Sequence, residues 1–298
     1  YKTMKKIFYK CLGHNIQKKI NKPIFFYHIP KCAGTTFAVL ISHLFKKTHR
    51  INGPLFKNND KGGLTAFENY LKIENIINSN ELQFIYGHLP FEIHNKLKNK
   101  YLFVTIVREP VQRCISHYTW ATSNNFFSKN DDIEELFKNN KLPKNTMVNQ
   151  FSGVGLSQSN SKELINLALK NLSNKIDLLF DIEDFFILLN WIISSYNLPN
   201  LFFQKQQVNH KKINISEKNI EKITKYNEQD IILYSKLLQN NLIKNIDNKT
   251  TKDRNITKYL YSSPELLVNN KKTLLLNENE IQVVEKKLIK SNYEIQKV

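Results

Sequence analysis

The sequence is short of cysteine and of long apolar runs, and each shortage excludes a class of protein. Its three cysteines, Cys11, Cys32 and Cys114, are too few and too scattered for a disulfide framework or a zinc site. A reduced, intracellular setting fits this composition, although the count still allows one disulfide. No segment is apolar over enough residues to form a signal peptide or a membrane span. We therefore expect a cytoplasmic protein without an integral membrane segment.

Acidic residues are outnumbered, with 26 Asp and Glu against 44 Lys and Arg, which gives a net charge of +18. Such a charge is typical of chains that bind a polyanion: nucleic acid, an acidic glycan, an anionic membrane surface or a nucleotide. Lys, Asn and Ile are abundant along the whole chain, however, as an AT-rich genome would also produce. Both causes of the charge stay open at this point.

Short apolar runs predict buried strands at 24–28, 83–86, 102–107, 175–180 and 201–204. Segments with helical periodicity follow most of these runs, and helices are expected over 35–45, from Pro110 onward, over 183–196 and, as a pair, over 217–240. Strands alternating with helices predict an α/β fold of the P-loop-like, three-layer kind, with a central, mainly parallel sheet of about five strands flanked by helices.

Two polar stretches, 52–63 and 245–255, are rich in Asn and Lys and are expected to be loops. The second stretch separates a large unit, 1–245, from a shorter one, 246–298. Apolar residues recur at helical spacing between Ile281 and Ile289. The last unit is therefore predicted to be a C-terminal helical appendage.

The first apolar run leads into P-I-F-F-Y-H-I-P-K-C-A-G-T-T-F, residues 23–37, the pattern of a phosphate-binding loop. Amides at a helix N-terminus are unpaired donors at the positive end of the helix dipole, and a phosphate satisfies both. Gly34 would let the backbone approach closely, Thr35 and Thr36 would add hydroxyl donors, and Lys31 would add a charge. A tight strand-to-helix turn with an ordinary threonine cap is the non-functional alternative.

This loop differs from that of the nucleoside triphosphatases. Their pattern, G-x-x-x-x-G-K-[ST], needs two glycines and a Lys directly before the Ser or Thr. Here the Lys comes first and the loop has a single Gly. Metal-dependent phosphoryl transfer from a triphosphate is therefore disfavoured, and no metal site is expected.

A second motif, Y-L-F-V-T-I-V-R-E-P-V-Q-R-C-I-S-H-Y, again predicts a strand, a turn and a helix. Arg108 stands at the carboxyl end of the strand, where open α/β sheets bind ligands. Ser116 follows two helical turns later, and a guanidinium with a hydroxyl makes a second anion site. A surface arginine and a solvated serine are the alternative. Each is common alone, but both together beside R-x-P at a strand end are less expected.

Together the two motifs resemble those of the sulfotransferases that use 3′-phosphoadenosine 5′-phosphosulfate (PAPS), in particular the heparan and chondroitin O-sulfotransferase branch. The resemblance implies that the 5′ end of the donor is held by Lys31, Cys32, Ala33, Gly34, Thr35 and Thr36. It implies that Arg108 and Ser116 hold the 3′-phosphate. PAPS would be a co-substrate, and no metal would be required.

Softer matches at 145–153 and 226–234 extend the resemblance over roughly residues 23–238, so that 1–245 would be the catalytic domain. The chain departs from the family in two places. Cys32 stands where the family often has Thr or Ser, and Asn149 stands where it often has Arg. The second departure removes one expected anion contact.

Sulfuryl transfer needs a base for the acceptor hydroxyl, and histidine titrates near neutral pH. His88, in F-I-Y-G-H-L-P-F, follows a short strand and should reach the same sheet edge as the anion sites. The resemblance agrees, since the glycan branch places a catalytic His or acid in a G-H-x-x-F segment. Lys31 would stabilise charge on the bridging oxygen of the leaving group. A structural His bonded to a loop carbonyl is the alternative for His88.

Further candidates for binding the acceptor are Arg113, His94 and Lys211, with a solvated charged face as the alternative for the lysine. The predicted activity is transfer of the sulfuryl group from PAPS to a carbohydrate hydroxyl, with anionic glycans among the candidate acceptors. A P-loop-type kinase is disfavoured by the missing G-K-[ST]. A charge-driven nucleic-acid-binding protein ranks last because the charge is diffuse and mostly Lys, so no nucleic-acid partner is expected.

Overall fold

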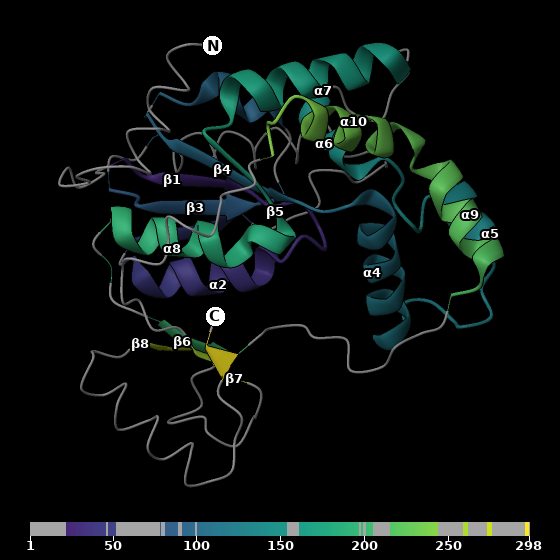
Figure 1. The fold of residues 1–298 in the computed structure, drawn as a ribbon, viewed down its shortest axis with the longest axis horizontal. Coiled ribbons are helices and arrows are strands. Elements are labelled where there is room, and N and C mark those ends of the chain that lie inside the picture. Colours follow the sequence, from purple (N-terminus) through teal and green to yellow (C-terminus); the bar gives the residue numbers. More distant parts are fainter. Residues whose placement is uncertain are drawn as a thin grey trace, which may run out of the picture.

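The computed structural model describes residues 22–45, 47–51, 78, 81–88, 91–98, 100–153, 161–196, 198, 201–204, 215–243, 259–261, 273–275 and 296–297. They form a parallel sheet between two layers of helices, a further group of helices at one end of that sheet, and a second, smaller sheet (Figure 1).

The main sheet consists of β1 (Ile24–Tyr27), β2 (Thr48–Ile51), β3 (Phe84–Gly87), β4 (Leu102–Val107) and β5 (Leu178–Asp181). Its spatial order is β2-β3-β1-β4-β5, and every neighbouring pair is parallel. The chain leaves β1 toward β2 but leaves β4 toward β5, so the connections diverge where β1 and β4 lie side by side. The carboxyl ends of these two strands therefore form a switch point of the kind that binds ligands in open α/β sheets.

Helices cover both faces of this sheet (Figure 1), with α2 (Gly34–Leu44) and α8 (Phe185–Ser195) on one and α6 (Thr146–Ser152), α7 (Ser161–Lys175) and α10 (Glu228–Gln239) on the other. Alternate side chains of β1 serve the two layers. Phe26 packs on Phe37 of α2, with ring centroids 4.5 Å apart, and Tyr27 packs edge-on against Phe151 of α6. All four residues of β1 are buried, as expected of a strand covered on both sides.

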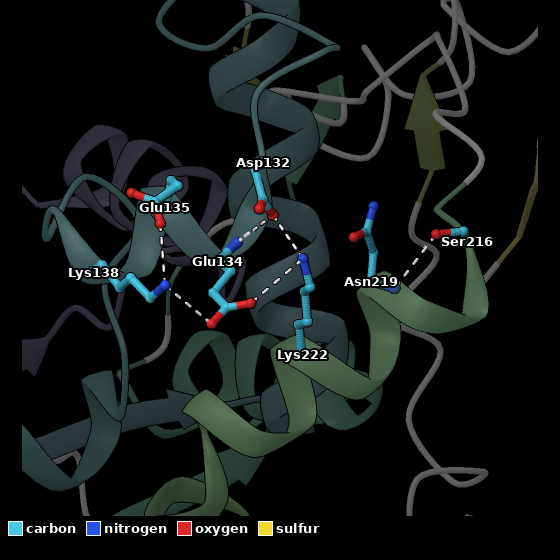
Figure 2. Close-up of polar contacts among 7 residues, drawn as sticks. All are labelled: Asp132, Glu134, Glu135, Lys138, Ser216, Asn219 and Lys222. Atoms are coloured by element: carbon cyan, nitrogen blue, oxygen red, sulfur yellow. Dashed lines mark hydrogen bonds and ion pairs between the residues drawn. The ribbon is translucent and has the colours of Figure 1, made fainter.

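At one end of the sheet, α4 (Pro110–Ser123), α5 (Ile133–Lys138) and α9 (Glu217–Tyr226) enclose a second apolar cluster (Figure 1). Phe137 of α5 stacks on Tyr226 of α9 at 4.5 Å. Figure 2 shows the polar contacts around these two helices, which join Asp132, Glu134, Glu135, Lys138 and Lys222, with Ser216 capping α9 at Asn219. Such surface ion pairs contribute little individually, and the apolar cluster holds α5 and α9 together.

The strand predictions are confirmed for four of the five runs, while 201–204 forms β6 in the second sheet. The fifth strand of the main sheet is instead β2, which was not predicted. Its sequence, T-H-R-I, contains no apolar run because Thr48 and His49 are only half-buried and Arg50 is exposed on an edge strand. The helices predicted at 35–45, at Pro110, at 183–196 and, as a pair, at 217–240 are confirmed with small shifts of their ends, the third beginning as a short 3₁₀ turn, η2 (Ile182–Asp184).

The second sheet has the order β8-β6-β7-β9 and joins β6 (Leu201–Gln204) to β7 (Tyr259–Tyr261), β8 (Thr273–Leu275) and β9 (Gln296–Lys297). The residues that the structure describes after 245 are thus strands of this second sheet, not the predicted helical appendage. Y-L-Y and T-L-L are rich in aromatic or β-branched residues, which suit strands. The predicted helix at 281–289 and the loops at 52–63 and 245–255 lie outside the described residues. No helix within the described ranges is both long and apolar enough to cross a membrane.

Candidate active site

The predicted phosphate loop connects β1 to α2 through a strained turn. Lys31 and Ala33 both have positive φ, 68° and 55°. Such a conformation is costly for residues with a Cβ and is typical of functional turns. Ala33 is the N-cap of α2 but has no side chain that could cap it, and no acidic residue lies in the first turn. The positive end of the helix dipole is therefore left for an external anion.

The structure shows a reason for glycine at position 34 that the sequence did not show. A Cβ at Gly34 would lie within 3.0 Å of three ring atoms of His28. His28 is buried, stacks on Phe26 and lies 4.2 Å, centroid to centroid, from the ring of His88. Burial lowers the pKa of His28 well below its usual range, so its ring stays neutral and supports the loop.

Arg108 and Lys31 meet at the switch point. Arg108 follows β4 and its Nη1 donates a 3.5 Å hydrogen bond to the carbonyl of Lys31. Burial lowers the pKa of Lys31, and the charge of Arg108 lowers it further. Among the described residues no carboxylate forms an ion pair with either cation. Two adjacent, unneutralised cations beside a helix N-terminus are suited to bind a ligand with several negative charges.

Trp120 of α4 completes this corner, and sequence reasoning missed it. The Lys31 ammonium lies over the Trp120 ring, 5.0 Å from its centroid. Ser116 is half-buried one helical turn earlier, which puts it on the same face of α4 as Trp120. Glu109 fixes the start of α4 by accepting hydrogen bonds from the amides of Val111 and Gln112. The i, i+4 spacing of Ser116 and Trp120 was the signal that could have found the tryptophan.

His88 follows β3 and is open to solvent. Its Nδ1 lies 2.9 Å from the carbonyl oxygen of His28. A carbonyl can only accept, so Nδ1 carries the proton and Nε2 is left as the basic nitrogen. Partial desolvation of the ring lowers the pKa of His88, and the charge of Arg50 lowers it further. The hydrogen bond to the His28 carbonyl acts in the opposite direction and raises the pKa. The ring is thereby held neutral, in the tautomer that a base requires.

The carbonyl of His28 has a second donor, Nε2 of the buried Gln150 on α6, at 3.4 Å. His117 of α4 also lies near this corner. Burial is the main cause that lowers its pKa to about 4, and the nearby charges of Arg113, Lys31 and His88 contribute. Gln150 was not expected from the sequence, where His117 was a weaker histidine candidate than His88. Both depend on α4 and α6 folding back over the end of β1.

Two of the residues predicted to bind the acceptor, Arg113 and His94, lie away from this site. Arg113 is wholly buried and donates to Oδ1 of Asn227 at 3.3 Å, so it cannot line an entrance. It falls on the face of α4 that packs against the α9–α10 junction. His94 is sandwiched against Phe91 and Phe103, and Phe103 precedes Arg108 by five residues, about 16 Å along an extended strand. His94 is thus near the opposite end of β4 from the anion site. Lys211 lies outside the described residues.

The two weaker sequence matches, 145–153 and 226–234, contact each other through a buried polar network. Asp230 of α10 accepts hydrogen bonds from the amides of Met147 and Val148, at 3.0 and 2.8 Å, and so caps α6. Asn227 accepts from the amide of Asn145 at 3.2 Å. In this structure these motif residues hold α6 against α10. Asn149, where the family often has Arg, donates to the carbonyl of Lys144 at 3.0 Å.

Cys32 and Cys114 are buried, free thiols, and burial raises the pKa of Cys32 to about 12. Cys32 is therefore a neutral side chain, and its contribution to the loop is its backbone. Across the described ranges, no three His, Cys, Asp or Glu side chains gather closely enough to hold a metal ion.

The fold and this edge define an α/β protein with a P-loop-like anion site at the switch point of its sheet. The sequence profile of the Sulfotransferase family matches residues 16–180, more than half of the chain, and the protein therefore belongs to that family. The match confirms the sulfotransferase family expected from the two motifs, while the heparan and chondroitin branch stays a prediction.

Among solved structures, a sulfotransferase from Alicyclobacillus acidocaldarius is similar at 12% identity and a TM-score of 0.42, covering 74% of this chain and 97% of that one. Mouse sulfotransferase SULT7A1, complexed with PAP, is 13% identical, with a TM-score of 0.35 and coverages of 84% and 86%. Retinol dehydratase in complex with androsterone and inactive cofactor PAP is 12% identical, with a TM-score of 0.31 and coverages of 95% and 85%. A search among curated proteins finds no match. Likenesses this distant say nothing about the substrate of this chain.

Proposed function

We propose that this sulfotransferase moves the sulfuryl group of PAPS to a carbohydrate hydroxyl by in-line displacement. One observation carries the proposal, the order of groups along the carboxyl edge of the sheet. Arg108 follows β4, Lys31 follows β1 and His88 follows β3, and these are neighbouring strands. Parallel strands bring their carboxyl ends to one edge, so two anion-binding groups and a base lie in a row.

In this proposal the donor spans the switch point. The amides from Cys32 to Thr36 and the N-terminus of α2 bind the 5′-phosphosulfate, while Arg108 and Ser116 bind the 3′-phosphate. The residues present suit such a donor, because the site offers two cations, Lys31 and Arg108, and the first turn of α2 has no carboxylate. Lys31 would exchange its contact with Trp120 for the bridging oxygen of the donor.

The chemical step forms one bond and breaks one. The acceptor oxygen attacks sulfur while its proton passes to Nε2 of His88, and the bond from sulfur to the bridging oxygen breaks. The electron pair of that bond remains on the leaving 3′,5′-bisphosphate. The Lys31 ammonium stabilises the negative charge that develops there. The His28 carbonyl supports the role of His88, because a hydrogen bond from Nδ1 stabilises the imidazolium that forms.

Two measurements test the proposal. Calorimetry should show tight binding of adenosine 3′,5′-bisphosphate and weak binding of ATP. Incubation with PAPS and a panel of glycans, phenols and steroids should add the mass of one sulfate to a glycan, as read by mass spectrometry. Preference for ATP would contradict the donor assignment. Sulfation of phenols or steroids without glycans would contradict the carbohydrate acceptor and leave the donor assignment intact.

A further inference from the structure

His117 lies on the face of α4 that carries Trp120. Residues three and four apart share one face of a helix, so His117 is grouped with Trp120 and, one turn earlier, with Arg113. The ring of His117 meets that of Trp120 edge-on, with centroids 6.0 Å apart, and the Lys31 ammonium lies over the same Trp120 ring. His117 is therefore at the corner where the two proposed anion sites meet, although no step of the proposed transfer uses it.

One nitrogen of this ring is buried without a partner. Within the described ranges, Nδ1 of His117 has no hydrogen bond, and neither do Nε and Nη1 of the wholly buried Arg113. Burial is the main cause that lowers the pKa of His117, and Arg113 has the largest effect of any charge, so the two side chains are neighbours. A guanidinium can only donate hydrogen bonds. A proton on Nδ1 would face donors alone, whereas a lone pair there can accept from Arg113, directly or through a water molecule.

The neutral ring of His117 therefore carries its proton on Nε2. Burial keeps the ring neutral near pH 7, because it lowers the pKa to about 4. With Nδ1 as the acceptor, Nε2 is left as an N–H donor. The ring is half-buried and Nδ1 is its buried nitrogen, so Nε2 is the nitrogen that a ligand can reach. His117 thus has the opposite tautomer to His88, whose Nε2 is the basic nitrogen.

The surroundings of His117 indicate which group of the donor its Nε2 meets. After burial and Arg113, the charges of Lys31 and His88 also lower the pKa of His117, so both residues lie close to it. In the proposed transfer Lys31 contacts the bridging oxygen and His88 receives the acceptor proton, which puts the sulfur atom between them. A group close to both residues is close to the sulfuryl oxygens. These oxygens carry negative charge during the transfer, and a preorganised N–H donor stabilises it.

We propose that His117 is a further catalytic residue, whose Nε2–H group donates a hydrogen bond to a sulfuryl oxygen of PAPS while Arg113 fixes the tautomer. The inference rests on the proposed function and deepens it. Adenosine 3′,5′-bisphosphate lacks the sulfuryl group, so only the sulfated donor can make this contact. Because the ring stays neutral, it stabilises the oxygen without exchanging a proton with the acceptor.

The test compares PAPS with the bisphosphate, two ligands that differ by the sulfuryl group. His117→Phe keeps a ring beside Trp120 and removes the N–H donor. It should lower kcat/KM for PAPS by about tenfold to a hundredfold, the loss of one hydrogen bond to a charged group, and leave the Kd of the bisphosphate unchanged. His117→Gln, whose side-chain amide can donate from near the position of Nε2, should recover most of the loss. Transfer rates with the acceptor that the panel identifies, and calorimetry with the bisphosphate, give these values.

His94→Phe serves as the matched control. His94 is also half-buried, and burial is the main cause that lowers its pKa to about 4, but it lies near the opposite end of β4. Its replacement should change neither kcat/KM for PAPS nor the affinity for the bisphosphate, and urea denaturation checks that each variant is folded.

An unchanged kcat/KM in His117→Phe, an equal loss of bisphosphate affinity, or no recovery in His117→Gln would each overturn the inference. Failure of the proposed function shows in the wild-type protein itself, as absence of transfer from PAPS to a glycan. Failure of the inference shows only in the variants. Wild-type transfer to phenols in place of glycans would remove the carbohydrate acceptor, and the same variants would still decide the role of His117.

Discussion

His28 contributes three groups to the site, although it touches no proposed reacting atom. Its amide donates to the carbonyl of Gly87 at 3.0 Å, and its carbonyl accepts from His88 and Gln150. Its ring fills the space above Gly34. One residue thus connects β3, the phosphate loop and α6, so that the base and the loop cannot move independently.

For His88, replacement by Ala should lower kcat by about 100- to 10,000-fold, the usual contribution of a general base. Binding of adenosine 3′,5′-bisphosphate should change little, because the proposed donor contacts lie on β1 and β4. Rapid-quench kinetics and calorimetry measure the two effects. If bisphosphate binding falls as far as kcat, His88 is not the base but part of the donor site.

Arg108→Ala should weaken binding of adenosine 3′,5′-bisphosphate by about tenfold to a hundredfold, the loss of one charged contact to phosphate. Binding of 5′-AMP should change far less, since it lacks the 3′-phosphate. Titration calorimetry with both ligands gives the comparison, and Arg108→Lys should be intermediate. Equal weakening of the two ligands would contradict the 3′-phosphate assignment and point to collapse of the Lys31 turn.

Among the elements, α4 connects the site to the second apolar cluster. One face carries Ser116 and Trp120 toward the phosphate loop, while Cys114 and Tyr118 pack into the cluster with α5 and α9. Arg113 lies buried between these faces; burial raises the pKa of the Asp230 carboxyl, and the charge of Arg113 opposes this rise. The helix that carries Ser116 and Trp120 is therefore held by contacts with α9 and α10.

Asp230→Asn tests this support. The substitution replaces one of the two oxygens that accept from the amides of α6 by an NH2 group, which cannot accept. A buried donor left without its acceptor typically destabilises a protein by about 1–3 kcal/mol, to be measured by urea denaturation. Asp132→Asn makes the same change in the exposed contacts of Figure 2 and should cost far less. Equal losses for the two variants would show that the buried network does not hold α6.

At the scale of the whole molecule, the strand order assembles the site from distant parts of the sequence. Positions 88, 31 and 108 follow one another across β3, β1 and β4. The charge of +18 is consistent with an anionic donor, but the cations that matter for the proposals are the few at this edge.

Half-buried histidines should also make the whole fold sensitive to acid. Burial is the main cause that lowers the pKa of His94 and His117, each to about 4 from 6.5. The unfolded chain then takes up protons at higher pH than the folded one, so the stability is full above 6.5 and is lost as pH falls toward 4. Urea denaturation across this range should show a falling free energy of unfolding.

His94→Phe keeps an aromatic ring between Phe91 and Phe103 and removes the titrating group. The variant should lose less stability between neutral and acidic pH than the wild-type protein. An unchanged slope would mean that other groups, such as the carboxylates, account for the acid sensitivity. Since His94 lies away from the proposed site, transfer activity at neutral pH should be retained.

The sequence by itself determined the local parts of this protein. Apolar runs with turn residues and helical spacing predicted four strands of the main sheet, α2, α4, and the pair α9 and α10, because these elements depend on near neighbours in the chain. The two motifs also predicted the family that the profile match confirms. The roles of Lys31, Arg108 and His88 stay predictions that the proposed experiments test.

Only the tertiary structure decided how these parts are combined. An exposed edge strand such as β2 has little apolar pattern, and β6 could not be assigned to a sheet without its partners. Arg113 and His94 look like polar binding residues in the sequence, yet packing buries one and places the other at the opposite end of β4. The tautomer of His88 depends on a carbonyl 60 residues away, because hydrogen bonds join groups that are close in space whatever their separation in the chain.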